Sequence, residues 1–118
     1  EYTWVSAFAS HAFQFVRRLT QDERRKWGYA GVWEIPAVRR DKDSEPQIPV
    51  ELPWRCLKMH SDANGVILDP FAGLGTTIIA AEQSGRVCRA IEADAMHCDL
   101  IVRRWEQFTG EKAEQIEA

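Results

Sequence analysis

The sequence predicts an α/β fold of the Rossmann-like kind, in which helices and a parallel sheet form three layers (α/β/α). Two short runs carry this prediction, "GVILD" at 65–69 and "RVCRAIE" at 86–92. The first is a continuous apolar run ending at an acid, which is typical of a buried parallel strand. Each run is followed, after a tight connection, by a helical pattern. The order strand–helix–strand–helix builds a parallel sheet.

The first 47 residues are treated as a basic N-terminal segment of a single domain. One helix face is expected there, although "YTWVSAF" also fits the start of a strand; its residues are Phe8, Ala12, Phe15, Val16 and Leu19. A strand broken at Pro36 is expected at 31–38, "GVWEIPAV". The run "RRDKDSEPQ" at 39–47 is typical of a charged loop.

Residues 48–118 are expected to form a helix followed by the βαβα unit. "PVELPWRCLKMHS" at 49–61 predicts a helix, because Pro49 and Pro53 fall at or within its first turn. "GTTIIAAEQSG" predicts a helix that stops at Gly85. Asp94 suits the N-cap of a last helix, which ends near Gly110. One apolar stripe of that helix is expected in the core: Met96, Leu100, Ile101, Trp105 and Phe108.

Length and composition fit one small globular domain or a piece of a larger protein, with 118 residues and a net charge of −3. Residues 1–42 contain eight Lys or Arg and five Asp or Glu, whereas residues 43–118 contain seven and thirteen. Three cysteines without Cys-x-x-Cys spacing favour a reduced, cytoplasmic chain. The histidines share no metal-ligand spacing with the cysteines, so no metal site is expected. No apolar run is long enough to span a membrane, so no membrane-spanning segment is expected.

The stretch "LDPFAGLGTT" at 68–77 is the strongest candidate for a ligand-binding turn. A phosphate-binding P-loop requires a lysine after its last glycine, but Thr76 follows Gly75, which excludes that class. A dinucleotide fingerprint requires a third glycine where Ile78 stands, which weakens that class without excluding it.

S-adenosylmethionine is the third candidate ligand. An acidic strand end at Asp69 suits its cationic methionyl side, and amides at a helix N-terminus suit polar or anionic groups. Glycines let the backbone approach a ligand closely. Glu92 follows Asp69 by 23 residues at the end of the next strand, from which an acid can accept hydrogen bonds from both ribose hydroxyls.

The motif "DPFAGLGTT" resembles the cofactor motif of DNA methyltransferases that modify adenine N6 or cytosine N4. The segment "PVELPWRCLKMHS" is similar to the helix before the cofactor strand in permuted members, whose catalytic part comes first in the chain. "VWEIP" and "DLIVRRWEQFTG" resemble phage-borne or prophage-borne members of such restriction-modification enzymes in particular. The resemblance covers roughly residues 30–110.

The resemblance implies an S-adenosylmethionine-dependent methyltransferase fold, and it implies which residues line the cofactor. Pro49 and Glu51 would lie near the methionine end, and Glu92 would bind the ribose. The other residues of this set lie in the motif around the two glycines: Asp69, Phe71, Gly73, Gly75, Thr76 and Thr77. The implied partner is duplex DNA.

The catalytic tetrapeptide of this family, Asp/Asn/Ser-Pro-Pro-aromatic, has no match, because no Pro-Pro dipeptide occurs in the sequence. That tetrapeptide orients the target amino group and stacks on a flipped base. In the permuted order it would precede Glu1, so we expect a C-terminal cofactor-binding part that is inactive alone.

Alternatives remain at the level of function. The chain could be a non-catalytic cofactor- or DNA-binding module that acts with a partner chain, or a small nicotinamide-binding domain. Arg24, Arg25 and Lys26 could contact a phosphate backbone or form a solvated face. An incomplete parallel sheet would leave an edge through which the chain could dimerise.

Overall fold

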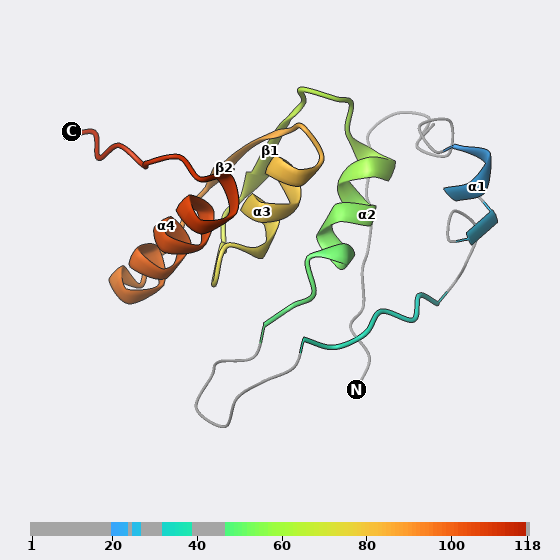
Figure 1. Cartoon of the computed structure of the whole chain (residues 1–118), viewed down its shortest axis with the longest axis horizontal. Coiled ribbons are helices and arrows are strands. Elements are labelled where there is room, and N and C mark those ends of the chain that lie inside the picture. Colours follow the sequence, from blue (N-terminus) through green and yellow to red (C-terminus); the bar gives the residue numbers. More distant parts are fainter. Residues whose placement is uncertain (1–19, 24, 27–31, 39–46, 118) are drawn as a thin grey trace.

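A computed structural model describes residues 20–23, 25–26, 32–38 and 47–117, and Figure 1 shows their arrangement. The elements in chain order are α1 (Gln21–Glu23), α2 (Glu51–His60), β1 (Val66–Asp69), α3 (Thr76–Gln83), β2 (Val87–Ala90) and α4 (Ala95–Thr109). The helix face expected between Phe8 and Leu19 lies outside the described residues.

The two strands form a parallel sheet, as predicted. Val66 is opposite Val87, and Asp69 is opposite Ala90. The chain reaches β2 from β1 through α3, which is the crossover that a parallel pair requires. Both strands therefore end at the same edge of the sheet, and this edge also carries the N-terminal ends of α2, α3 and α4 (Figure 1).

One face of the sheet is covered by helices. Ile67 and Cys88, at the middle of the two strands, pack against Leu57 of α2 and against Ala80 and Ala81 of α3. The two alanines are almost completely buried, and their small side chains allow α3 to approach the strands closely. α4 lies alongside α3 (Figure 1).

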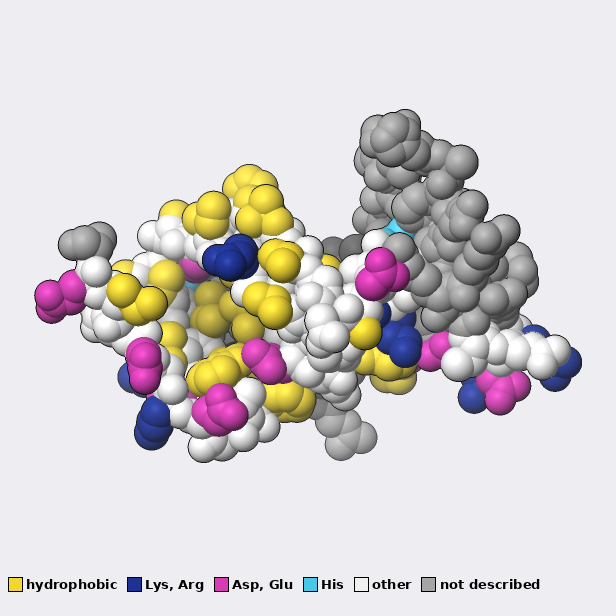
Figure 2. Space-filling view, turned by 90° about the horizontal axis from the view of Figure 1, so that it is seen from above, with side chains coloured by type: hydrophobic (Ala, Val, Ile, Leu, Met, Phe, Trp, Pro, Cys, Tyr) yellow, Lys and Arg dark blue, Asp and Glu magenta, His cyan; other side chains and the backbone are white. Residues whose placement is uncertain are grey.

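The opposite face of the sheet is uncovered in the described part of the chain. Val66, Leu68 and Val87 are 63%, 69% and 51% exposed, and Arg89 lies opposite Leu68 on the same face. We call these four residues the open sheet face. Figure 2 shows hydrophobic side chains gathered on one side of the molecule with a basic side chain among them. The described residues thus supply the sheet and one helical layer of the predicted three-layer fold.

Glycines and an aspartate set the helix boundaries where the sequence predicts them. Gly85 and Gly110 have φ values of +67° and +78°, and each follows the end of a helix. The side chain of Asp94 accepts hydrogen bonds from the amides of Met96 and His97, which makes it the N-cap of α4. No helix among the described residues combines the length and apolar content needed to cross a lipid bilayer.

Two predicted features are wrong. The described residues of the strand expected at 31–38 form no strand: residues 32–38 have no strand pairing, and Trp33 packs on Met59 of α2 instead. The α4 stripe is not core, because no residue of α4 is buried and Met96 is 74% exposed. The physical reason is that α4 contacts α3 beside a two-stranded sheet. Three of the five stripe residues, Met96, Leu100 and Phe108, therefore stay exposed in the described part of the chain.

Candidate functional site

The candidate site begins where β1 ends and the chain enters the glycine turn, residues 70–75. Asp69 is the last residue of β1, and its Oδ1 accepts a hydrogen bond from the Phe71 amide at 3.1 Å. This local bond is an Asx turn, which directs the chain out of the strand. Gly73 and Gly75 then take φ values of +54° and +73°, a left-handed conformation that other residues adopt at a cost.

Glu92 connects the turn to the second strand. Its Oε2 accepts a hydrogen bond from the Gly73 amide at 2.7 Å, and its Oε1 accepts one from the Asp94 amide at 2.9 Å. The two acids that the sequence placed 23 residues apart are therefore joined through the same turn. Each carboxylate oxygen can accept more than one hydrogen bond, so Glu92 retains acceptor capacity for a ligand.

The environment of Glu92 stabilises its charged form. The Asp94 amide has the largest effect, and the amides of Gly73 and Ala93 add to it, so the pKa of the Glu92 carboxyl lies below its ordinary value despite partial burial. His97 contributes from 3.9 Å. The site therefore contains an ionised carboxylate at neutral pH, which is the state that accepts hydrogen bonds from hydroxyl groups most strongly.

The N-terminus of α3 presents hydrogen-bond donors at the same place. Its N-cap is Gly75, which offers no capping side chain, and the amides of Thr76, Thr77 and Ile78 have no acceptor among the described residues. Unsatisfied amides at a helix start carry partial positive charge. Thr76 is buried at 8% exposure, whereas Thr77 is half-buried.

The outer side of the glycine turn is open. A Cβ placed on Gly73 would meet no atom within 4 Å, so the backbone is accessible there. Phe71 is 88% exposed, so it is not part of the core of the described residues, and its apolar ring is uncovered beside the turn. Accessible amides, an ionised acceptor and an uncovered ring form a site with both polar and apolar contacts.

The inner side of the turn packs on α4, which sequence reasoning did not anticipate. The Ile101 side chain would lie 3.0 Å from a Cβ on Gly75, so glycine is also needed there for space. The guanidinium of Arg104 donates a hydrogen bond to the Leu74 carbonyl. The one available signal is that Arg104 interrupts the apolar stripe between Ile101 and Trp105.

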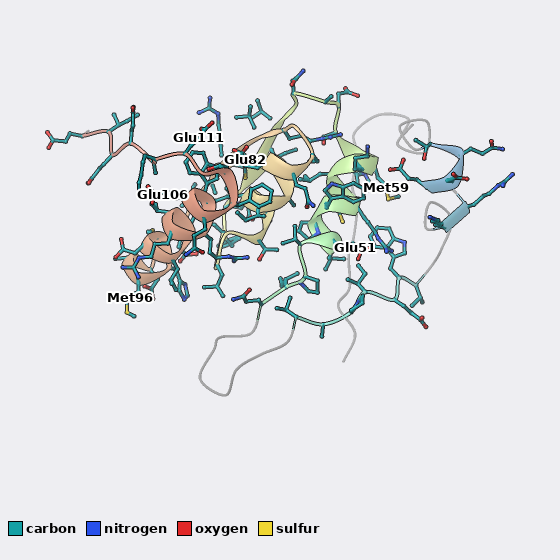
Figure 3. All side chains as sticks on the ribbon, viewed as in Figure 1. Glu51, Met59, Glu82, Met96, Glu106 and Glu111 are labelled. Carbon is teal, nitrogen blue, oxygen red and sulfur yellow. The ribbon has the colours of Figure 1, made fainter. Side chains whose placement is uncertain are left out.

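Glu51 is the first residue of α2, and the N-terminal end of this helix lies toward the same end of the sheet (Figures 1 and 3). Pro49 precedes Glu51 by two residues. The Pro49 carbonyl accepts a hydrogen bond from the Leu52 amide at 3.1 Å. Glu51 pairs with Arg55 one helical turn later. Among the described residues, no hydrogen bond or ion pair joins these two residues to the glycine turn, so their expected role near the methionine end stays a prediction.

The basic cluster lies next to α1. Arg25 and Lys26 are exposed, whereas Arg24 lies outside the described residues. Thr20 and Glu23 bond reciprocally through side chains and amides, at 3.2 and 2.8 Å, which is a capping box. Glu23 also pairs with Lys58 of α2 at 3.8 Å. The exposed positions of Arg25 and Lys26 suit either a solvated face or a phosphate contact.

Comparisons with known proteins agree on one family. A family profile described as DNA methylase matches residues 8–103. The Type II methyltransferase M.BglI of Bacillus subtilis is 34% identical over 91 residues, which is 77% of this chain and 26% of that protein. The DNA adenine methyltransferase YhdJ of Escherichia coli is 33% identical over 89 residues, 72% of this chain and 30% of that protein.

The fold comparison gives the same result. A Thermus thermophilus protein assigned as a DNA modification methylase, solved in complex with S-adenosyl-L-methionine, superposes with a TM-score of 0.65. Its sequence is 26% identical, and the match covers 95% of this chain and 44% of that protein. The chain thus spans between a quarter and a half of the length of these three relatives.

Proposed function

The chain belongs to the DNA methylase family, and on that basis we propose that residues 48–118 bind S-adenosylmethionine for methyl transfer to adenine N6 or cytosine N4 of duplex DNA. The observation that carries the proposal is the hydrogen bond from the Gly73 amide to Glu92 at 2.7 Å. Through this bond the glycine turn and the second acid form one site at the carboxyl edge of a parallel sheet, where α/β proteins bind ligands.

The residues fit the chemistry of this cofactor. Glu92 would accept hydrogen bonds from the ribose hydroxyls, and the α3 amides would bind the methionyl carboxylate. Asp69 would shape the turn and lie near the methionyl ammonium, and the open side of Gly73 admits close approach. When bound, the cofactor supplies a methyl group on a positively charged sulfonium. The Thermus relative was solved in complex with S-adenosyl-L-methionine, which supports the choice of cofactor.

We propose further that this chain supplies the cofactor part of a larger, permuted methyltransferase of phage or restriction-modification type, with the cofactor part last in the chain. The absence of a Pro-Pro dipeptide from the sequence and the open sheet face support this proposal. A parallel sheet is normally covered on both faces. The second helical layer and the tetrapeptide that orients the target base would come from the catalytic part.

A second candidate is a non-catalytic cofactor-binding module that acts with a partner chain. The open sheet face favours it equally, because an apolar patch around Arg89 suits a partner surface. The two candidates differ in the part that covers the open sheet face. In the enzyme this part contains the catalytic Pro-Pro tetrapeptide, and in the module the partner chain lacks it.

DNA contact is proposed for Arg24, Arg25 and Lys26. Contacts to phosphates make binding weaken steeply with salt, so replacing all three residues with alanine should flatten the dependence of affinity on salt. An unchanged slope in a filter-binding titration would identify the cluster as a solvated face.

Calorimetric titration of the chain with S-adenosylhomocysteine tests cofactor binding, because this ligand keeps the ribose and lacks the reactive methyl group. Glu92→Gln should weaken binding about tenfold or more, and Glu92→Ala should weaken it further. Glu114→Gln, at an exposed position in the C-terminal tail, is the matched control. Equal binding by wild type and Glu92→Ala would refute the ribose assignment, and binding of a nicotinamide dinucleotide instead would assign the turn to that cofactor.

A further inference from the structure

Four consecutive residues of the glycine turn are each held from the β2–α4 side. The Ala72 amide donates to the Ile91 carbonyl at 3.0 Å, and the Gly73 amide donates to Glu92. The next two contacts come from α4 itself: Arg104 donates to the Leu74 carbonyl, and Ile101 fills the space beside Gly75.

The contact at Leu74 differs from the other three because it fixes a peptide plane between two glycines. Gly73 and Gly75 have no Cβ, so sterics alone leave the intervening peptide planes free to rotate. The Leu74 carbonyl is bonded to Arg104, and the amide on the other side of the same peptide, that of Gly75, donates to the Ala72 carbonyl at 2.8 Å. The peptide is trans, so its two polar groups point in opposite directions and both are held.

Arg104 acts here as a hydrogen-bond donor to a backbone carbonyl and not as a member of an ion pair. In the part of the chain that the structure describes, its hydrogen bond goes to the Leu74 carbonyl, and no salt bridge involves it. Its side chain is half-buried, and burial lowers the pKa of the guanidinium, which stays charged because arginine is not deprotonated in proteins. A hydrogen bond from a charged donor is stronger than one from a neutral donor.

From this geometry we propose that Arg104 is a positioning residue for cofactor binding: it fixes the Leu74–Gly75 peptide and thereby the direction of the amides that start α3. The proposal rests on the proposed function, since it assigns a role in the same site. Arg104 touches the turn from the α4 side, whereas a Cβ on Gly73 would meet no described atom within 4 Å. Its effect on the ligand is therefore transmitted through the backbone.

The test uses the 118-residue chain with Arg104→Met, which keeps most of the apolar stem and removes the donors, and with Arg103→Ala as the matched control on the exposed side of α4. Two quantities are measured: the affinity for S-adenosylhomocysteine by calorimetry, and the hydrogen exchange of the Gly73 and Gly75 amides by NMR without ligand. Arg104→Met should bind about tenfold more weakly and exchange the Gly75 amide faster. Arg103→Ala should change neither.

Chemical rescue separates positioning from general stability. Arg104→Ala removes the whole side chain, and added ethylguanidinium should restore part of its affinity by donating to the Leu74 carbonyl. Urea, which is similar in shape but neutral, and sodium chloride at the same concentration should not. Rescue of this kind requires a cation that donates at one place, so a general loss of packing does not produce it.

The results of these measurements support or overturn the positioning role of Arg104. Wild-type affinity in Arg104→Met, or a lower affinity with unchanged Gly75 exchange and no rescue, would overturn the positioning role. If the wild-type chain does not bind the ligand, the exchange measurement still decides whether Arg104 holds the turn, and the failure then belongs to the proposed function. If Arg104→Met does not fold, the rescue of Arg104→Ala and the conservative Arg104→Gln, which keeps an uncharged donor, provide the same comparison.

Discussion

Glu92 has two tasks at the residue scale, because the carboxylate proposed to bind the ribose also holds the turn. Its oxygens accept hydrogen bonds from the amides of Gly73 and Asp94. The same carboxylate therefore connects the glycine turn after β1 to the segment between β2 and α4. A ligand that bonds to Glu92 therefore meets an acceptor already fixed on both sides. Prior fixation lowers the entropy lost on binding.

The first prediction concerns the pH dependence of stability. The folded-state pKa of Glu92 is lowered from an ordinary value of 4.5, so its contribution to stability is complete above that pH and is lost as pH falls through the folded-state pKa. The melting temperature of wild type should exceed that of Glu92→Gln by a constant amount from neutral pH down to 4.5. The difference should then shrink as the pH falls further, through the lowered folded-state pKa of Glu92.

Scanning calorimetry across this range measures the difference, and the comparison with Glu92→Gln removes the titration of the other acids. A difference that persisted unchanged to the lowest pH would mean that the charge of Glu92 contributes nothing to holding the turn.

The second prediction separates the two glycines of the turn. Gly75→Ala should destabilise the chain by about 2–4 kcal/mol, because it combines a left-handed backbone with a contact of 3.0 Å to Ile101. Gly73→Ala should cost only about 1–2 kcal/mol, since its Cβ meets no atom within 4 Å. Urea unfolding measures both. Gly75→Ala combined with Ile101→Ala, which removes the two γ carbons nearest to the new Cβ, should cost less than the two single substitutions added together. Equal losses at the two positions would show that the Ile101 contact is unimportant.

At the scale of elements, local chemistry explains why most helices and strands could be predicted. The predicted strands at 65–69 and 86–92 are observed as β1 (Val66–Asp69) and β2 (Val87–Ala90). Gly85, Gly110 and Asp94 mark helix ends through backbone conformation and capping, which depend on a few neighbouring residues.

Features that depend on a distant surface could not be predicted in this way. The apolar stripe of α4 has helical periodicity, which fixes the helix but does not say what covers the stripe. In the same way, "GVWEIPAV" has the composition of a strand, but a strand requires a paired neighbour, and Trp33 packs on α2 instead.

The third prediction concerns the start of α4. Asp94 Oδ1 accepts hydrogen bonds from the amides of Met96 at 2.8 Å and His97 at 3.4 Å, so Asp94→Ala should lower the free energy of unfolding by about 1 kcal/mol. Asp99→Ala is the control, because it replaces an exposed aspartate inside the helix with a better helix former. Urea unfolding followed by circular dichroism measures both variants. An equal effect of the two substitutions would show that the N-cap contributes nothing.

At the scale of the whole molecule, the two acids of the site could be predicted from the sequence, whereas the α4 residues that hold the glycine turn could not. Asp69 and Glu92 could be placed together from the sequence because parallel strands end at one edge, and the Gly73–Glu92 hydrogen bond agrees with that placement. Arg104 and Ile101 could not, because their contacts with the turn depend on how α4 packs against α3. Homodimerisation through the sheet edge stays a prediction, and the open sheet face adds a second surface through which a partner could bind.

The last prediction is that this chain alone transfers no methyl group to DNA, even if it binds the cofactor. Methyl transfer requires groups that orient the target amino nitrogen toward the sulfonium and stack on the flipped base, and the sequence contains no Pro-Pro tetrapeptide to supply them. The helical layer that would carry such groups against the sheet is the one that the open sheet face lacks. Incubation with methyl-labelled S-adenosylmethionine and unmethylated duplex DNA should give incorporation equal to that of the Asp69→Ala variant. Incorporation above that background by wild type would show that the chain carries its own base-orienting groups, and residues 1–47, which precede the cofactor unit, would then be the place to seek them.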